Sequence, residues 1–288
     1  MSTDYRAKAT LPLRVELIRQ LRRRRTLVAY LLIVALPLIV VAAVKFGPSA
    51  EPSNSGGGGR RFGGGSLDLV GLATSGAWNF TVTMIFFASG FLLLIIVALF
   101  CGDTVASEAS WSTLRYLLAA PVPRRRLLRQ KLIIGLLLSL VAIVALVLLS
   151  YVIGLIAFGS GSLASPAGGV FTDSEALFRV TVITGFVFVS LLFAGGIAFL
   201  MSVWTDVPLG AVGTAVVIVI VSNILDAISA LGSIREWLPT HYANAWLGAL
   251  ASDIDWTNMA RGAAYSIVAF ALCIGYAVYR FDRKDIVS

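Results

Sequence analysis

The sequence predicts an all-α integral membrane protein with six transmembrane helices. Of its 288 residues, 58% are hydrophobic and 13% are charged, whereas a soluble domain carries about 25% charged residues. The mean hydropathy is +0.89. The apolar runs approach or exceed the roughly 20 residues that a membrane helix needs, and they do not alternate with period two. Because lipid cannot satisfy free backbone groups, this pattern favours helices over a closed barrel.

The chain begins with a basic segment, residues 1–25, that we separate from the six-span domain at 26–288. Within 11–25, the apolar residues Leu13, Leu17, Ile18 and Leu21 fall on one helical face, and Glu16, Arg19, Gln20 and Arg23 fall elsewhere. The spacing predicts an amphipathic helix that lies in the membrane interface. The alternative is a disordered basic tail.

The six spans are expected at about 26–46, 78–101, 132–158, 178–203, 209–230 and 260–280. Pro37 lies in the middle of the first and is expected to kink it. A glycine-rich run at 56–65 lacks the residues of a phosphate-binding loop and is typical of a flexible linker. Cys101 and Cys273 lie in or beside spans, without metal-ligand spacing, and are expected to be packing residues.

Lysine and arginine are distributed unevenly between the two sides of these spans. Seventeen fall on the side of the N-terminus and at most five on the other, apart from Lys45 within the first span. This bias predicts a multi-pass protein of the cell membrane with both termini in the cytoplasm. The net charge of +8 arises from clusters at span ends, which indicates contacts with membrane lipids and argues against nucleic acid as a partner.

The longest charged interruption of the apolar region is residues 102–131, between the second and third spans. It starts with the acids Asp103 and Glu108 and ends with a basic block that includes Lys131. Pro121 and Pro123 interrupt it, because proline removes a backbone donor and clashes with the preceding turn. We expect a short helix over 104–118, a proline turn, and a basic start of the third span.

The same stretch carries a resemblance to a known family. Glu108 is followed by the run Ser112-Thr113-Leu114-Arg115, then by Leu118, Pro121-Val122, Arg124 and Lys131. This order resembles the segment after the second span of ABC-2 type transporter permeases, in which glycine usually stands where this chain has Ser112. The motif covers about 30 residues, and the topology of six spans extends the resemblance to the whole chain.

The resemblance implies that 104–118 is a cytoplasmic coupling helix, which seats on a separate ATP-binding subunit. It also implies that the helix at 11–25 is the elbow helix of the family. The residues expected to make the coupling contact are Glu108, Trp111, Thr113, Leu114, Arg115 and Leu118, together with Asp206 in the short hinge after the fourth span. The alternatives are a helix that rests on lipid headgroups and, for the hinge, a plain tight turn.

In the family, the second and fifth spans line the central cavity. The corresponding residues here are Asn79, Phe80, Met84, Phe87, Ser222 and Asn223. Their aromatic and apolar character suits a hydrophobic or amphiphilic substrate. Ordinary helix packing is the alternative for each of them.

The loop at 231–258 is rich in Trp and Tyr and contains the only histidine, His241. Thr240, after Pro239, is placed to cap a short helix that runs through Leu250. The loop is either an outer re-entrant gate or an aromatic anchor in the interface. His241 has no second ligand at metal spacing, and we expect no metal site.

Taken together, the resemblance implies the membrane-spanning permease subunit of an ABC exporter, which is not itself an enzyme. The sequence has no Gly-x4-Gly-Lys-Ser/Thr motif, so ATP and Mg²⁺ are expected in a partner. The expected partners are two copies of an ATP-binding subunit and a second copy of this permease. The alternative, from a different class, is a membrane anchor or sensor that recruits a cytoplasmic partner without transport. An intramembrane enzyme is disfavoured, because the spans lack paired carboxylates and a nucleophile with its base.

Overall fold

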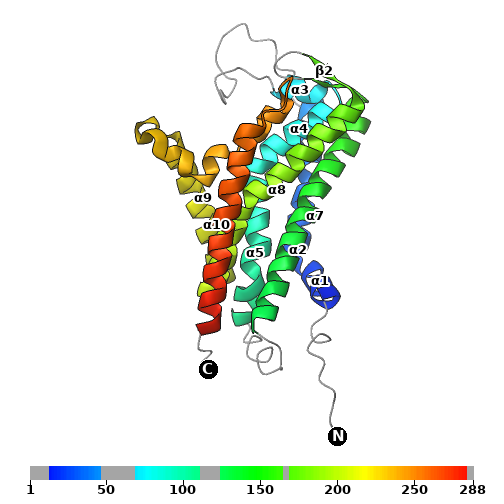
Figure 1. Cartoon of the computed structure of the whole chain (residues 1–288). Coiled ribbons are helices and arrows are strands. Elements are labelled where there is room, and N and C mark those ends of the chain that lie inside the picture. Colours follow the sequence, from blue (N-terminus) through cyan, green and yellow to red (C-terminus); the bar gives the residue numbers. More distant parts are fainter. Residues whose placement is uncertain (1–12, 47–68, 111–123, 165–168, 284–288) are drawn as a thin grey trace.

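The computed structural model describes residues 13–46, 69–110, 124–164 and 169–283 (Figure 1). Almost all of these residues are helical, as the composition predicts. The expected all-α class is therefore confirmed, and the only strands in the described parts are two short ones.

The elements, in chain order, are α1 (Leu13–Leu21), α2 (Arg24–Phe46), α3 (Leu69–Thr74), α4 (Ala77–Phe87), the π-helical turn η1 (Ala88–Leu92), α5 (Leu93–Ser110), α7 (Arg124–Phe158), β1 (Leu163–Ala164), β2 (Val170–Phe171), α8 (Asp173–Trp204), α9 (Pro208–Ala227), the 3-10 helices η2 (Ser229–Trp237), η3 (Pro239–Tyr242) and η4 (Ala245–Leu250), and α10 (Trp256–Arg283). Strands β1 and β2 pair antiparallel, with Leu163 opposite Phe171.

Six helices are long and apolar enough to cross a membrane: α2, the continuous α4–η1–α5, α7, α8, α9 and α10. The shortest has 20 residues, which at 1.5 Å per residue matches the roughly 30 Å of a hydrocarbon core. The helix α1 and the last turn of α10 lie at one end of the bundle, and α3 and the β1–β2 hairpin lie at the other (Figure 1). We refer to these as the α1 end and the hairpin end.

Helix α8 is the centre of the bundle and packs most extensively on α5 and α10. Two adjacent glycines permit this close approach. A Cβ at Gly195 would lie 3.2 Å from Cys101 Sγ, and one at Gly196 would lie 3.2 Å from the Phe270 backbone. Small residues at such contacts let membrane helices pack closely. The van der Waals contacts then favour association, because lipid supplies no hydrophobic driving force between helices.

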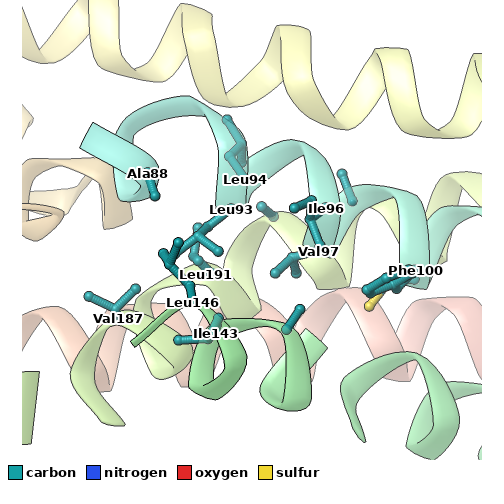
Figure 2. Close-up of a cluster of buried hydrophobic side chains, with 14 of the residues drawn as sticks. Ala88, Leu93, Leu94, Ile96, Val97, Phe100, Ile143, Leu146, Val187 and Leu191 are labelled. Atoms are coloured by element: carbon teal, nitrogen blue, oxygen red, sulfur yellow. The ribbon is translucent and has the colours of Figure 1, made fainter. Parts of the chain in front are cut away.

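A cluster of buried hydrophobic side chains fills the space between α5, α7 and α8. Figure 2 shows Leu93 on α5, Leu146 on α7 and Leu191 on α8 meeting in it. The exposed large hydrophobic residues lie mainly on α2, α7, α9 and α10, whose outer faces are apolar. Soluble proteins bury most such residues, whereas apolar outer faces are typical of helices that face lipid.

The second span does not end where the sequence predicts. We expected it to stop near Cys101, with a separate helix from Thr104, but α5 runs without a break to Ser110. Two features make this possible. The carboxylate of Asp103 is paired with arginines of the N-terminal segment, and the Thr104 hydroxyl donates to the Cys101 carbonyl at 2.8 Å within the helix. The rest of the expected coupling helix lies in 111–123, outside the described residues.

The segment between α9 and α10 also differs from the prediction. We expected one helix from Thr240 through Leu250, but the chain forms the separate 3-10 helices η3 and η4. The Thr240 hydroxyl does not cap a helix, because it is buried and bonds the Ser222 hydroxyl at 2.6 Å. Trp246 is fully buried and fastens η4 to the core.

Candidate functional site: a buried charged cluster at the α1 end

Four charged residues from three helices meet at the α1 end, and we call them the charged cluster: Glu16 and Arg19 of α1, Glu108 of α5 and Lys131 of α7. Lys131 Nζ lies 2.6 Å from Glu108 Oε1 and 3.5 Å from Glu16 Oε1. Arg19 Nη2 lies 2.8 Å from Glu16 Oε2 and also pairs with Glu108. The side chains of Glu16, Glu108 and Lys131 are 4%, 2% and 2% exposed, whereas that of Arg19 is 41% exposed, so the cluster has a buried centre and one member at its edge.

The helical spacing of α1 explains how its polar residues reach the interior. Glu16 and Gln20 are four residues apart and therefore share one face, and both are buried. The Gln20 amide donates to Glu16 Oε1 at 3.1 Å. The apolar residues Leu13 and Ile18 are 45% and 40% exposed. Thus α1 buries Glu16 and Gln20 against the protein, while Leu13 and Ile18 face outward.

A second group of ion pairs adjoins the cluster. Arg23 Nη1 lies 2.8 Å from Asp103 Oδ2 and donates to the Ser107 hydroxyl at 2.8 Å. Arg25 also pairs with Asp103. Both groups therefore connect the N-terminal segment to the last turns of α5.

Charge balance makes the cluster tolerable in the interior. Transferring one ion from water into a protein costs several kcal/mol even after relaxation, and pairing offsets this cost only when the charges match. Here Glu16 and Glu108 are matched by Arg19 and Lys131. Removing one member leaves an uncompensated charge, which in buried pairs costs about 3–5 kcal/mol.

The surroundings also shift the titration of the α1 residues. Burial by itself raises the pKa of Glu16, but the charges of Lys131 and Arg19 and the hydrogen bonds from Arg19 and Gln20 outweigh it, so this pKa falls below its ordinary value. Burial lowers the pKa of Arg19, while Glu108 and Glu16 raise it by more, so this pKa is raised. Both side chains are therefore held in their charged forms.

The end of α5 is joined to α8 as well. The Ser202 hydroxyl accepts hydrogen bonds from the backbone N–H groups of Val105 and Ala106, at 3.1 and 2.9 Å. Ser202 is 1% exposed. The last turns of α5 are thus bonded to α1, α7 and α8 at one level of the bundle, so a displacement of this helix end must involve all three neighbours.

The chemistry of the cluster suits a structural contact between helices. Its members are two carboxylates, a guanidinium and an ammonium that neutralise each other, and no thiol or imidazole lies among them. Among the described residues, no group of three or more His, Cys, Asp or Glu side chains could hold a metal ion. What the arrangement can do is hold α1, α5 and α7 in one relative position.

The structure places only some of the predicted coupling residues. Glu108 is buried in the charged cluster instead of lying on an exposed helix face. Asp206 is exposed in the hinge between α8 and α9. The other predicted contact residues lie outside the described parts of the chain: Trp111, Thr113, Leu114, Arg115 and Leu118.

The residues predicted to line a substrate path separate into two groups. Phe80 and Met84 are buried in a small apolar cluster. Asn79 is 1% exposed, donates to the Ser75 hydroxyl and the Ser162 carbonyl at 2.8 and 3.0 Å, and accepts from the Ala164 N–H at 3.0 Å. These contacts, like the Ser222–Thr240 bond, hold the chain together in this conformation.

Phe87 and Asn223 belong to the second group, whose side chains are exposed. Phe87 is 44% exposed and adjoins the π-helical turn η1. Asn223 is exposed on α9, where Ile220, three residues earlier, and the adjacent Ile224 are also exposed. All six residues stay predictions as the lining of a path.

The sequence does not by itself identify Glu16, Arg19, Asp103 and Lys131 as one site. The available signal was the position of acids in or beside otherwise apolar helices, where an unpaired charge is costly and a partner is required. The partners from the N-terminal segment lie about 80 to 115 residues away in the chain, and the spacing within any one segment does not reveal them.

The fold and this cluster define an all-α protein with six helices of membrane-spanning length, joined at one end by buried ion pairs. The chain belongs to the family described as Protein of unknown function (DUF2705), whose profile matches residues 67–287. The match includes Asp103, Glu108 and Lys131 and starts after α1 and α2. No curated protein matches the chain.

Proposed function

We propose that this chain is the membrane-spanning permease subunit of an ABC exporter in the cell membrane. In this proposal the α1 end faces the cytoplasm, and a separate ATP-binding subunit, present in two copies, binds ATP and Mg²⁺. The substrate class that fits the apolar helices is hydrophobic or amphiphilic. The proposal rests on the resemblance of residues 108–131 to ABC-2 permeases and on the basic residues that the sequence concentrates at this end.

One structural observation supports the proposed coupling mechanism. Residues 111–123, which contain most of the resembling motif, connect α5 to α7, and the Glu108–Lys131 pair joins these two helices on either side of that segment. A force on the segment therefore acts on α5 and α7 as a unit, and through Arg19 it also acts on α1. ATP drives such a movement only if nucleotide binds the two conformations with different affinity.

A second copy of the chain completes the proposed assembly. Asn223 has an exposed amide on the apolar outer face of α9, and within the described residues it makes no hydrogen bond. A polar side chain on a lipid-facing surface is unfavourable without a partner, and membrane helices use Asn to bond across interfaces. We therefore place the contact between two copies on this face of α9.

The test is co-purification and ATP hydrolysis. The chain is expressed with an ATP-binding protein encoded beside it, purified as a complex in mild detergent and reconstituted in vesicles. We expect substrate-stimulated ATP hydrolysis that Arg115→Glu in the connecting segment reduces, with Arg261→Glu at the opposite end as the matched control. If the two proteins associate and no compound is ever moved or stimulates hydrolysis, the chain is an anchor that recruits its partner.

A further inference from the structure

Three aromatic rings lie on the surface where α8 and α10 end, at the α1 end of the bundle. Trp204 is the last residue of α8, and Tyr276 and Tyr279 lie in the last two turns of α10; they are 52%, 44% and 52% exposed. The Trp204 and Tyr276 ring centroids are 6.4 Å apart, as are those of Tyr276 and Tyr279. Rings of this kind prefer the boundary between hydrocarbon and headgroups.

Two arginines are held against these rings. Arg280 Cζ lies 4.9 Å from the centre of the Trp204 ring, and Arg283 Cζ lies 4.3 Å from that of Tyr279. Stacking of this kind fixes the plane of the guanidinium and leaves its edge donors available. Two guanidiniums, each held on a ring, therefore lie in the last turn of α10.

Neither arginine is neutralised by a carboxylate within the described parts of the chain. Asp282 lies between them in the sequence, but its carboxylate accepts from Arg125 Nε at 2.8 Å. Three arginines of the N-terminal segment differ in this respect, since Arg19, Arg23 and Arg25 are engaged in ion pairs. Arg280 and Arg283 therefore present uncompensated positive charge.

The surface next to these arginines is apolar. On α10, Leu272 lies one turn before Tyr276 on the same face and is 69% exposed. At the start of α9, Leu209 is 80% exposed. The positively charged patch thus adjoins an apolar face. A phospholipid has the same arrangement, with a charged headgroup next to apolar acyl chains.

We propose that Trp204, Tyr276, Tyr279, Arg280 and Arg283 form a binding site for the headgroup of an anionic phospholipid. The two guanidiniums donate hydrogen bonds to the phosphate oxygens, a geometry that suits arginine better than lysine. The acyl chains lie along Leu272 and its neighbours. A soluble anion has no acyl chains to cover the apolar face. This inference does not depend on the proposed transport function.

The experiment uses the full chain in mild detergent and counts bound lipids by native mass spectrometry during titration with phosphatidylglycerol or phosphatidylcholine. We expect tighter binding of phosphatidylglycerol, and we expect Arg280→Gln with Arg283→Gln to weaken it about tenfold or more, because hydrogen bonds to charged groups are lost. Arg280→Lys with Arg283→Lys keeps the charge, and we expect it to restore binding only in part.

The matched control is Arg14→Gln with Arg22→Gln, which removes the same charge from exposed arginines of the same end. We expect this control to bind phosphatidylglycerol as the unaltered chain does, with equal helix content in all variants. Equal loss in the control pair would overturn the site, because binding would then reflect general surface charge. Competition by millimolar inorganic phosphate would overturn it as well, since the ligand would then be a free anion.

Discussion

Lys131 Nζ lies 2.6 Å from Glu108 Oε1, and these two residues lie on either side of the segment that connects α5 to α7. Both side chains are 2% exposed, so water contributes little to either charge. Each residue thus depends on the other and on the α1 residues for compensation. This relationship defines the first prediction, and it gives Glu108 an interior ion pair that the sequence did not suggest.

Neutralising one residue of the pair is expected to destabilise the protein more than neutralising both. Glu108→Gln or Lys131→Met alone leaves a buried charge and should cost about 3–5 kcal/mol. The double variant should cost clearly less than the sum, because the leftover charge is also removed. Thermal unfolding of the four proteins in one detergent measures the coupling, and additive costs would mean that the two charges do not interact.

Acid is expected to release α1 from the bundle in part through Glu16. The folded-state pKa of this group lies below its ordinary value of 4.5. The stabilisation from ionised Glu16 is therefore complete above about pH 4.5 and is lost as the pH falls through the lowered value. Melting temperatures from pH 7 to pH 3 should fall less steeply for Glu16→Gln than for the unaltered chain.

Glu236→Gln is the control for the acid experiment, because this carboxylate is exposed and far from the charged cluster. Its melting temperatures should follow those of the unaltered chain over the whole pH range. A Glu16→Gln profile with the unaltered steepness would contradict the assignment of Glu16 as an acid-sensitive contact.

Arg179 is expected to hold the segment around η4 to α8. Its guanidinium donates to the carbonyls of Ala249 and Ala251, both at 2.6 Å, and of Ser252 at 2.9 Å. Lysine keeps the charge but cannot reach all three acceptors, and each lost bond should cost about 1.5–3 kcal/mol. We expect faster amide exchange over 245–252 in Arg179→Lys, measured by mass spectrometry.

The control for this prediction is Arg235→Lys, which alters a partly buried arginine of the same loop, where the guanidinium donates to the Asp226 carbonyl at 3.1 Å. Exchange over 245–252 should stay unchanged in this variant. Unchanged exchange in Arg179→Lys itself would show that Trp246 and the apolar contacts alone hold η4.

Both termini are expected to face the cytoplasm. A cysteine at Asp253, exposed at the hairpin end, should react with a membrane-impermeant maleimide in intact cells, and a cysteine at Ser112 should react only after the cells are opened. The charge bias is the physical reason, because basic segments are retained on the cytoplasmic side. The reverse pattern would invert the orientation and remove the ATP-binding partner from reach of residues 111–123.

Two copies of the chain are expected to meet at α9. In a chain without Cys101 and Cys273, a cysteine at Asn223 should form a disulfide between copies in native membranes. A cysteine at Leu272, which is 69% exposed on α10, should not, because that face is expected to contact lipid. Cross-linking at 272 and not at 223 would move the interface from α9 to α10.

The helical class, the number of spans and their approximate positions followed from the sequence. The reason is that lipid imposes a strong and local rule: each span must be a long apolar helix that satisfies its own backbone. The count of spans and their approximate bounds depend only on that rule. The basic start of α7 at Arg124 followed from the prolines before it in the same way.

The tertiary structure decided what the polar residues do. The sequence suggested that α5 stops near Cys101, but partners brought by α1 and α2 neutralise Asp103 and Glu108 and let the helix continue to Ser110. Asn79, whose place in a substrate path stays a prediction, bonds the hairpin in the folded chain, a role that the sequence did not suggest. The energy of a buried charge or amide depends on partners from distant segments, and only the packing of the six helices brings those partners together.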